Sequence, residues 1–133
     1  MKSHIHFMGI GGIGMSFLAR WYAAEGHPVS GCDLAESAEI QALRREGIPA
    51  CAGHDPDHLR AATPGPGGLP PVDALVYSMA VPDDHPELQR ARAAGLKVCR
   101  RIDLLGHLLT TRQAIAVTGT HGKSTTTGMI AQI

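Results

Sequence analysis

The sequence has few aromatic residues, few cysteines and no excess of charge of either sign. Of its 133 residues 4% are aromatic and three are cysteine, and twelve basic residues balance twelve acidic ones. A chain with no net charge lacks the basic surface that nucleic acid or an anionic membrane attracts, so we expect neither as a partner. Cys32, Cys51 and Cys99 are odd in number and form no CxxC pair. We therefore expect reduced, structural thiols rather than a disulfide framework.

The sequence also has no apolar run long enough to span a bilayer, and its first residues have no secretory apolar region. We accordingly expect a cytoplasmic protein. Apolar residues make up 44% and charged residues 18% of the chain, which is the balance of a globular domain.

Apolar segments alternate with amphipathic ones along most of the chain. This alternation predicts an α/β fold, a Rossmann-like parallel sheet with helices on both faces. A Pro/Gly-rich loop is expected over 61–71. Strands are expected at 4–8, 28–32, 48–51, 74–77, 98–99 and 114–117, and helices at 13–25, 37–46, 86–94 and 102–111.

A first glycine loop follows the first expected strand. Gly9, Gly11 and Gly14 fit the pattern G-x-G-x-x-G, and a helix should begin within it. Glycines allow a tight turn, and the free N–H groups of a helix N-terminus bind phosphate oxygens. Asp33 ends the second expected strand, where an acid often binds a ribose hydroxyl. The motif predicts a diphosphate site without saying which diphosphate; a nicotinamide-dependent oxidoreductase and a glycine turn kept for packing stay open.

A second glycine motif spans residues 118–125 and opens an expected helix, which begins at Lys123. Its Gly-Lys-Ser core is that of a P-loop, although Val117 stands where G-x-x-x-x-G-K-S/T has its first glycine. Backbone amides would hold the phosphates of ATP, Lys123 would reach the β- and γ-phosphates, and Ser124 could bind Mg²⁺. His121 either contacts phosphate or points to solvent, and the sequence leaves this open.

The two loops suggest two domains. Residues 1–111 would form the first, and 112–133 would contain the first strand, P-loop and helix start of a second, truncated one. We therefore expect this chain to be a fragment of a longer protein.

His4 and His6 alternate along one strand and could imitate a metal-binding pair. The sequence places no cysteine or carboxylate cluster beside them, so we expect a role at the surface or at the sheet end.

The combination of motifs resembles the UDP-N-acetylmuramate–L-alanine ligases of the Mur ligase family. The segments that carry the resemblance are HFMGIGGIGMS (6–16), VSGCD (29–33), GHD (53–55), YSMAVP (77–82), PEL (86–88), the pair Arg100-Arg101 and AVTGTHGKSTTT (116–127). Cys32, Met79 and Asp103 depart from the family's usual Ser, Ser and Glu.

The resemblance implies a ligase of peptidoglycan synthesis that joins L-alanine to UDP-N-acetylmuramate and uses ATP and Mg²⁺. It places the diphosphate on Gly11, Gly12, Ile13 and Gly14, the uridine near Asp33, and a neighbouring wall at Ser78 and Ala80. It places ATP on Gly119, Thr120, His121, Gly122, Lys123, Ser124 and Thr125, with Lys123 stabilising the migrating phosphoryl group and Ser124 binding Mg²⁺.

Two other functions remain possible besides that of an oxidoreductase. One is a related recycling ligase that attaches a preformed peptide to UDP-N-acetylmuramate, and the other is a non-catalytic nucleotide-sugar-binding module. The resemblance places the amino-acid pocket beyond this chain, so we expect the chain alone to be inactive. The oligomeric state is not predicted.

Overall fold

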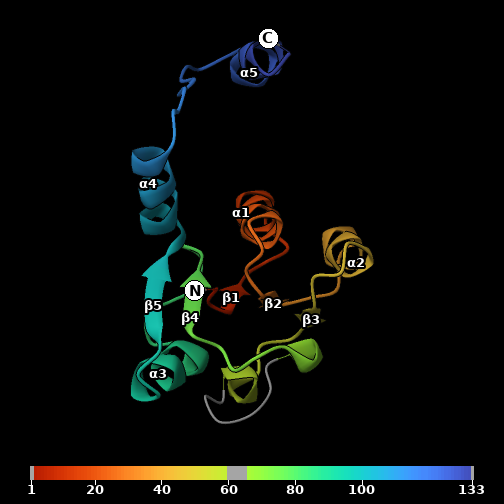
Figure 1. The fold of residues 1–133 in the computed structure, drawn as a ribbon, viewed down its shortest axis with the longest axis vertical. Coiled ribbons are helices and arrows are strands. Elements are labelled where there is room, and N and C mark those ends of the chain that lie inside the picture. Colours follow the sequence, from red (N-terminus) through yellow and green to blue (C-terminus); the bar gives the residue numbers. More distant parts are fainter. Residues whose placement is uncertain (1, 60–65, 133) are drawn as a thin grey trace.

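The computed structural model describes residues 2–59 and 66–132, and a five-stranded parallel sheet lies at its centre (Figure 1). The strands are β1 (Ile5–Met8), β2 (Val29–Asp33), β3 (Ala50–Ala52), β4 (Ala74–Tyr77) and β5 (Lys97–Arg100). The helices are α1 (Ile13–Ala24), α2 (Ala38–Arg45), α3 (Pro86–Ala93), α4 (Arg101–Thr111) and α5 (Lys123–Ile130), with short 3-10 turns η1 (Pro56–Leu59) and η2 (Pro66–Gly68). The α/β fold with a parallel sheet is confirmed. Of the expected loop, 61–65 lie outside the described residues, and η2 occupies its middle.

The order of the strands is β3-β2-β1-β4-β5, and all neighbouring pairs are parallel. The chain first builds the sheet outward from β1 through β2 to β3. It then returns to the other side of β1 with β4 and β5. The direction of winding therefore reverses between β1 and β4, and open α/β sheets bind ligands at such a reversal.

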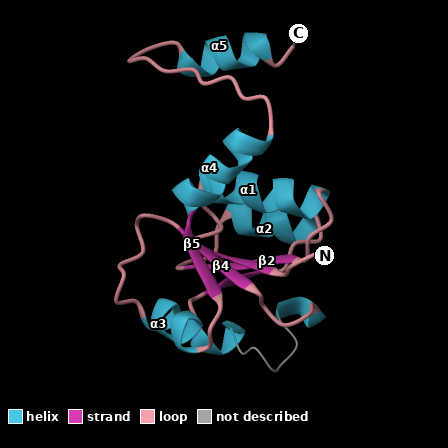
Figure 2. Cartoon of the chain, turned by 60° about the vertical axis from the view of Figure 1, so that its left-hand side comes forward, coloured by secondary structure: helices cyan, strands magenta, loops and turns pink. Residues whose placement is uncertain are grey.

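Helices cover both faces of the sheet (Figure 2). Successive strand residues point to opposite faces, so Ile5 and Phe7 of β1 belong to a core with α1 and α2, while Met8 belongs to a second core with α3. The side chains of Phe7, Met8 and Leu43 have no exposed surface. The sheet is thus buried on both faces, as parallel sheets require.

Segment 114–117, which we expected to form a sixth strand, is irregular and largely exposed. A β-strand needs a neighbouring strand to accept and donate its backbone hydrogen bonds, and no described strand lies beside this segment. The following helix, α5, begins at Lys123 as predicted. It lies apart from the sheet (Figure 1).

His4 and His6 are not at the surface, so the expectation of a surface role was wrong. His4 does lie at the end of the sheet, directly before β1, whereas His6 lies within β1. Both side chains are fully buried on the α3 face of the sheet. His4 Nε2 and His6 Nδ1 each lie 2.8 Å from the hydroxyl oxygen of Ser30 on β2. The hydrogen-bond partner that compensates for the burial of both rings comes from another strand, so the local sequence could not reveal it.

No helix within 2–59 and 66–132 is long and apolar enough to cross a membrane.

Candidate functional site

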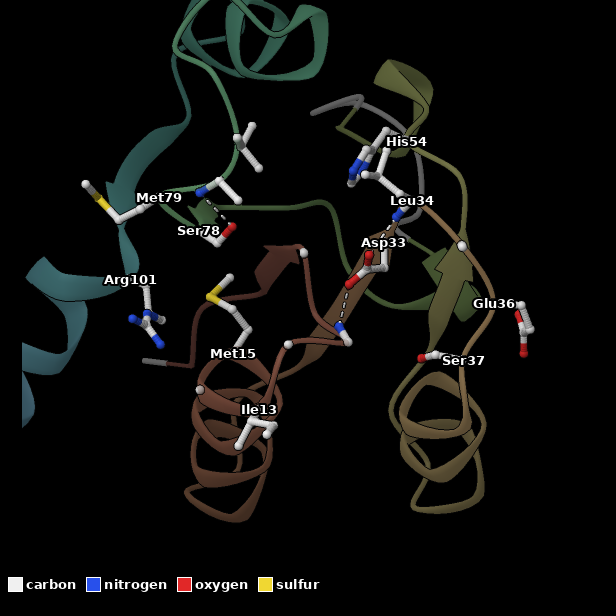
Figure 3. Close-up of a pocket in the computed structure, with 17 residues that line it drawn as sticks. Ile13, Met15, Asp33, Leu34, Glu36, Ser37, His54, Ser78, Met79 and Arg101 are labelled. Carbon is white, nitrogen blue, oxygen red and sulfur yellow. Dashed lines mark hydrogen bonds between the residues drawn. The ribbon is translucent and has the colours of Figure 1, made fainter. Parts of the chain in front are cut away.

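A pocket of about 610 Å³ opens at the carboxyl ends of β1, β2 and β4 (Figure 3). Its position coincides with the reversal in strand order, and its size is that of a typical small-molecule site. Its lining comes from five segments that are distant in the sequence: the first glycine loop, the chain after β2, His54 after β3, the chain after β4, and the start of α4.

The first glycine loop forms the wall of the pocket nearest α1. Gly9 has φ of +85°, a backbone conformation that residues other than glycine rarely adopt. Its N–H donates to the carbonyl oxygen of Cys32 at 2.8 Å. Gly12 caps α1 without any side-chain hydrogen bond. No hydrogen bond among the described residues uses the N–H groups of Ile13 and Gly14. The start of α1 therefore presents free donors and the positive end of the helix dipole to the pocket.

Asp33, at the end of β2, lies beside the first glycine loop. Its carboxylate accepts hydrogen bonds from the N–H groups of Gly11 and Leu34, each at 2.7 Å. A Cβ at residue 11 would stand 2.8 Å from Asp33 Oδ2, so only glycine lets the two segments approach this closely. Asp33 is thus fixed beside the glycine loop within the same pocket.

The chain that follows β4 supplies the third wall. The hydroxyl of Ser78 accepts a hydrogen bond from the N–H of Ala80 at 3.3 Å. The structure therefore brings together all seven residues that the sequence assigned to the UDP-sugar: Gly11, Gly12, Ile13, Gly14, Asp33, Ser78 and Ala80 all line this pocket.

Arg101, at the start of α4, is a pocket residue to which the sequence gave no role. Its guanidinium lies against Gly14, so that a side chain at residue 14 would displace it. A positive charge thus stands beside the free N–H groups of α1, and both favour a bound anion. The Arg100-Arg101 pair was the available signal, but only the packing of α4 shows which arginine enters the pocket.

The rim of the pocket is apolar. Ile13 is 90% exposed, Leu34 80% and Met79 67%, and all three line the opening (Figure 3). Exposed apolar side chains grouped around a pocket are typical of a ligand-binding site.

The second glycine loop lies away from this pocket, on the segment leading to α5 (Figure 2). Gly122 caps α5 with φ of +75°, and the first turn of the helix contains Lys123 and Ser124 and no acidic residue. The loop and the first turn are exposed to solvent. A glycine in the left-handed region, a helix N-terminus and a lysine together fit the phosphates of a nucleotide, and the Ser124 hydroxyl is a hard oxygen ligand suited to Mg²⁺.

Comparison with known proteins agrees with the fold. Residues 4–113 match the model of the Mur ligase family, catalytic domain. The chain belongs to the Mur ligase family. The family that the sequence motifs indicated is therefore confirmed.

Individual relatives are more specific. The UDP-N-acetylmuramate–L-alanine ligase of Deinococcus radiodurans is 52% identical over 128 residues, which are 96% of this chain and 26% of that protein. Among solved structures, the UDP-N-acetylmuramate–alanine ligase of Thermotoga maritima is 37% identical with a TM-score of 0.80, over 96% of this chain and 28% of that one. A murein peptide ligase of Psychrobacter arcticus is 33% identical with a TM-score of 0.81, over 97% of this chain and 25% of that one. The chain thus spans about a quarter of the length of these relatives.

Proposed function

We propose that this Mur ligase chain binds the nucleotide sugar of an ATP-dependent ligase that joins L-alanine to UDP-N-acetylmuramate in peptidoglycan synthesis. The observation that carries the proposal is the pocket, in which Arg101 lies beside the free N-terminus of α1. The 52% identity to a UDP-N-acetylmuramate–L-alanine ligase supports this substrate. We also infer a cytoplasmic site of action, as for an enzyme of the kind that the chain resembles.

In the proposed complex the diphosphate occupies the start of α1. The N–H groups of Ile13 and Gly14 donate to phosphate oxygens, and Arg101 balances their charge. Asp33, held by two backbone N–H groups, accepts from a hydroxyl of the ribose or uridine side. Ile13, Leu34 and Met79 cover the apolar faces of the ligand at the rim.

Residues 112–133 contribute the second nucleotide site in this proposal. Gly119 to Thr125 hold ATP, Lys123 balances charge on the phosphates, and Ser124 provides one oxygen ligand for Mg²⁺. ATP, when bound, supplies the phosphoryl group that activates the substrate carboxylate for attack by the amine of L-alanine. Lys123 is the group of this chain that would stabilise the transferring charge. We assign residues 1–111 to the UDP-sugar domain and 112–133 to the beginning of the ATP-binding domain.

A second candidate within the family is a ligase that attaches a preformed peptide to the same nucleotide sugar. The TM-score of 0.81 to a murein peptide ligase favours it, because the folds overlap as well as those of the alanine ligases do. Both candidates use this pocket for the same nucleotide sugar, and identity to the alanine ligases is higher, at 52% against 33%. We therefore place the alanine ligase first.

Calorimetric titration of the chain with UDP-N-acetylmuramate, with NADH as a parallel ligand, tests the proposal. We expect saturable binding of the nucleotide sugar with one site per chain and no binding of NADH. The variant Arg101→Met should weaken binding of the nucleotide sugar. The variant Arg92→Met, on the other face of the sheet, should leave this binding unchanged. Binding of NADH alone would overturn the proposal and assign the glycine loop to an oxidoreductase.

A further inference from the structure

A cluster of four potential metal ligands lies under the sheet, on the face that α3 covers. It consists of His6 from β1, Cys32 from β2, His58 from η1 and Glu87 from α3. One ligand atom from each residue lies within 4.8 Å of the ligand atoms of the other three. The side chains of His6, Cys32 and Glu87 are fully buried. We call these four residues the HCHE cluster.

The contacts inside the HCHE cluster converge on its carboxyl group. The Cys32 thiol donates to Glu87, with Sγ lying 3.4 Å from Oε1 and 3.6 Å from Oε2. His6 Nε2 lies 3.6 Å from Glu87 Oε1. His54 flanks the cluster, with its Nδ1 3.0 Å from Cys32 Sγ and 3.4 Å from Glu87 Oε2. Three strand and helix elements thus direct polar atoms into one buried volume.

Two nitrogen atoms of the cluster have no hydrogen-bond partner among the described residues. They are His6 Nε2 and His58 Nδ1, and both atoms are buried. A buried polar atom without a partner is destabilising, and native proteins satisfy nearly all such atoms. His6 Nδ1, by contrast, is held by the hydroxyl of Ser30, which fixes the orientation of the imidazole. A ring held through one nitrogen while the other points into a group of ligands is the usual arrangement of a metal-binding histidine.

Burial disfavours the charged forms of these groups when no cation balances them. It lowers the pKa of His6 to about 3, raises the pKa of Glu87 to about 7, and raises the pKa of the Cys32 thiol well above its usual range. A divalent cation changes this balance. The cation brings two positive charges, while the thiol and the carboxyl group release their protons to solvent and bring two negative ones, so the buried site stays neutral.

We propose that the HCHE cluster is a structural Zn²⁺ site with His6, Cys32, His58 and Glu87 as its four ligands. The donor set favours Zn²⁺ over Mg²⁺ or Ca²⁺, because one sulfur and two imidazole nitrogens suit a borderline-soft ion and the two alkaline-earth ions prefer oxygen. Four protein ligands leave no open position, as structural zinc sites require. Bond lengths of about 2.0–2.3 Å place tetrahedral ligand atoms roughly 3.3–3.8 Å apart, so the cluster must contract by about 1 Å.

The site would fix the floor of the substrate pocket. Cys32 directly precedes Asp33, and His54, which flanks the cluster, lines the pocket itself. Zn²⁺ would also join η1 to the sheet, because His58 is the one ligand that η1 contributes. The inference is independent of which nucleotide sugar or peptide the enzyme uses.

Metal content and metal binding of the whole chain test this site. The chain is stripped with a chelator and then titrated with Zn²⁺ against a competing chelator, and it is titrated separately with Co²⁺ as an optical probe. We expect one Zn²⁺ per chain, a higher unfolding temperature with Zn²⁺, and a thiolate-to-cobalt charge-transfer band with the strong visible absorption of tetrahedral Co²⁺. Tetrahedral coordination and thiolate ligation are both read on the unmodified chain, so the result does not depend on variants that fold.

Two ligand variants and one matched control locate the site. Cys32→Ser and His58→Asn should each weaken Zn²⁺ binding. The loss should exceed the roughly 10–100-fold loss that follows when a residue hydrogen-bonded to a metal ligand is changed. Cys99→Ser should leave affinity unchanged, because Cys99 lies on the opposite face of the sheet, against the carbonyl of Leu75. The absence of stoichiometric Zn²⁺ binding, or a Co²⁺ complex without the charge-transfer band, would overturn the proposal. Equal affinity in Cys32→Ser and the unmodified chain would do the same.

Discussion

Replacing Gly12 by aspartate should abolish most binding of the nucleotide sugar while leaving the fold intact. Gly12 caps α1 at the mouth of the pocket, with φ of −72° and ψ of 141°, which any residue can adopt. A Cβ at this position meets only the carbonyl oxygen of Gly9, at an ordinary contact distance of 3.5 Å. Aspartate is a better helix cap than glycine by a few tenths of a kcal/mol, so the free energy of unfolding should stay the same or rise slightly.

The same side chain competes with a bound diphosphate. Its carboxylate accepts from the free N–H groups of the first turn of α1, and it places a negative charge where the proposed diphosphate binds. Two like charges about 5 Å apart repel by about 1 kcal/mol in water and about 3 kcal/mol at an effective dielectric constant of about 20. Because Gly12 is exposed, we expect a loss of about 1.5–3 kcal/mol, or about 10–100-fold in affinity.

The assay is calorimetric titration with UDP-N-acetylmuramate at two salt concentrations, with urea unfolding of the same samples. Gly12→Asn is the matched control, because it has the same shape and caps the helix equally well without charge. The Asp variant should bind far more weakly than the Asn variant, and the difference should shrink at high salt. Equal affinities in the two variants would refute an anion site at the start of α1.

Three further outcomes follow from the structure. Arg101→Met should reduce affinity for UDP-N-acetylmuramate by about 10-fold or more, as expected for a lost hydrogen bond to a charged group; an unchanged titration would remove Arg101 from the site. Lys123→Met should weaken binding of a fluorescent ATP analogue by a similar factor and leave the nucleotide sugar unaffected, whereas Lys97→Met should change neither; loss of both ligands would point to a folding defect. Leu43→Ala, at a fully buried position, should lower the free energy of unfolding by about 2–5 kcal/mol in urea titrations. Leu109→Ala, at a position that is 53% exposed, should lower it by less than about 0.5 kcal/mol. Similar losses in the two variants would contradict the assigned core.

Helix and strand positions up to residue 111 were predictable because their signals are local. The apolar run before Gly9, the serine that caps α2 and the proline at the start of α3 each act within a few residues. Ser37 illustrates this, since its hydroxyl accepts from the N–H of Ile40, three positions along the chain. The expected strand at 114–117 failed for the opposite reason, because a strand depends on a partner that no local pattern supplies.

The pocket residues likewise fall into those that the local sequence predicts and those that only the packing reveals. Gly9, Gly11, Gly14 and Asp33 were found from spacing alone, because a phosphate loop between a strand and a helix is a contiguous motif. Arg101 was missed as a site residue, because its place over Gly14 depends on how α4 leaves β5. The order of β4 beside β1, which joins Ser78 to the first glycine loop, is likewise a property of the assembled sheet.

The sequence by itself determined the fold class, the two glycine loops and the family, because each rests on residues that are neighbours in the chain. Only the tertiary structure decided that His6, Cys32, His58 and Glu87 meet beneath the pocket, since they come from β1, β2, η1 and α3. Alternation along β1 could show that His4 and His6 share a face, but not that this face is buried. Which groups share a buried volume is fixed by long-range packing, and the chemistry available to a buried histidine depends on those neighbours.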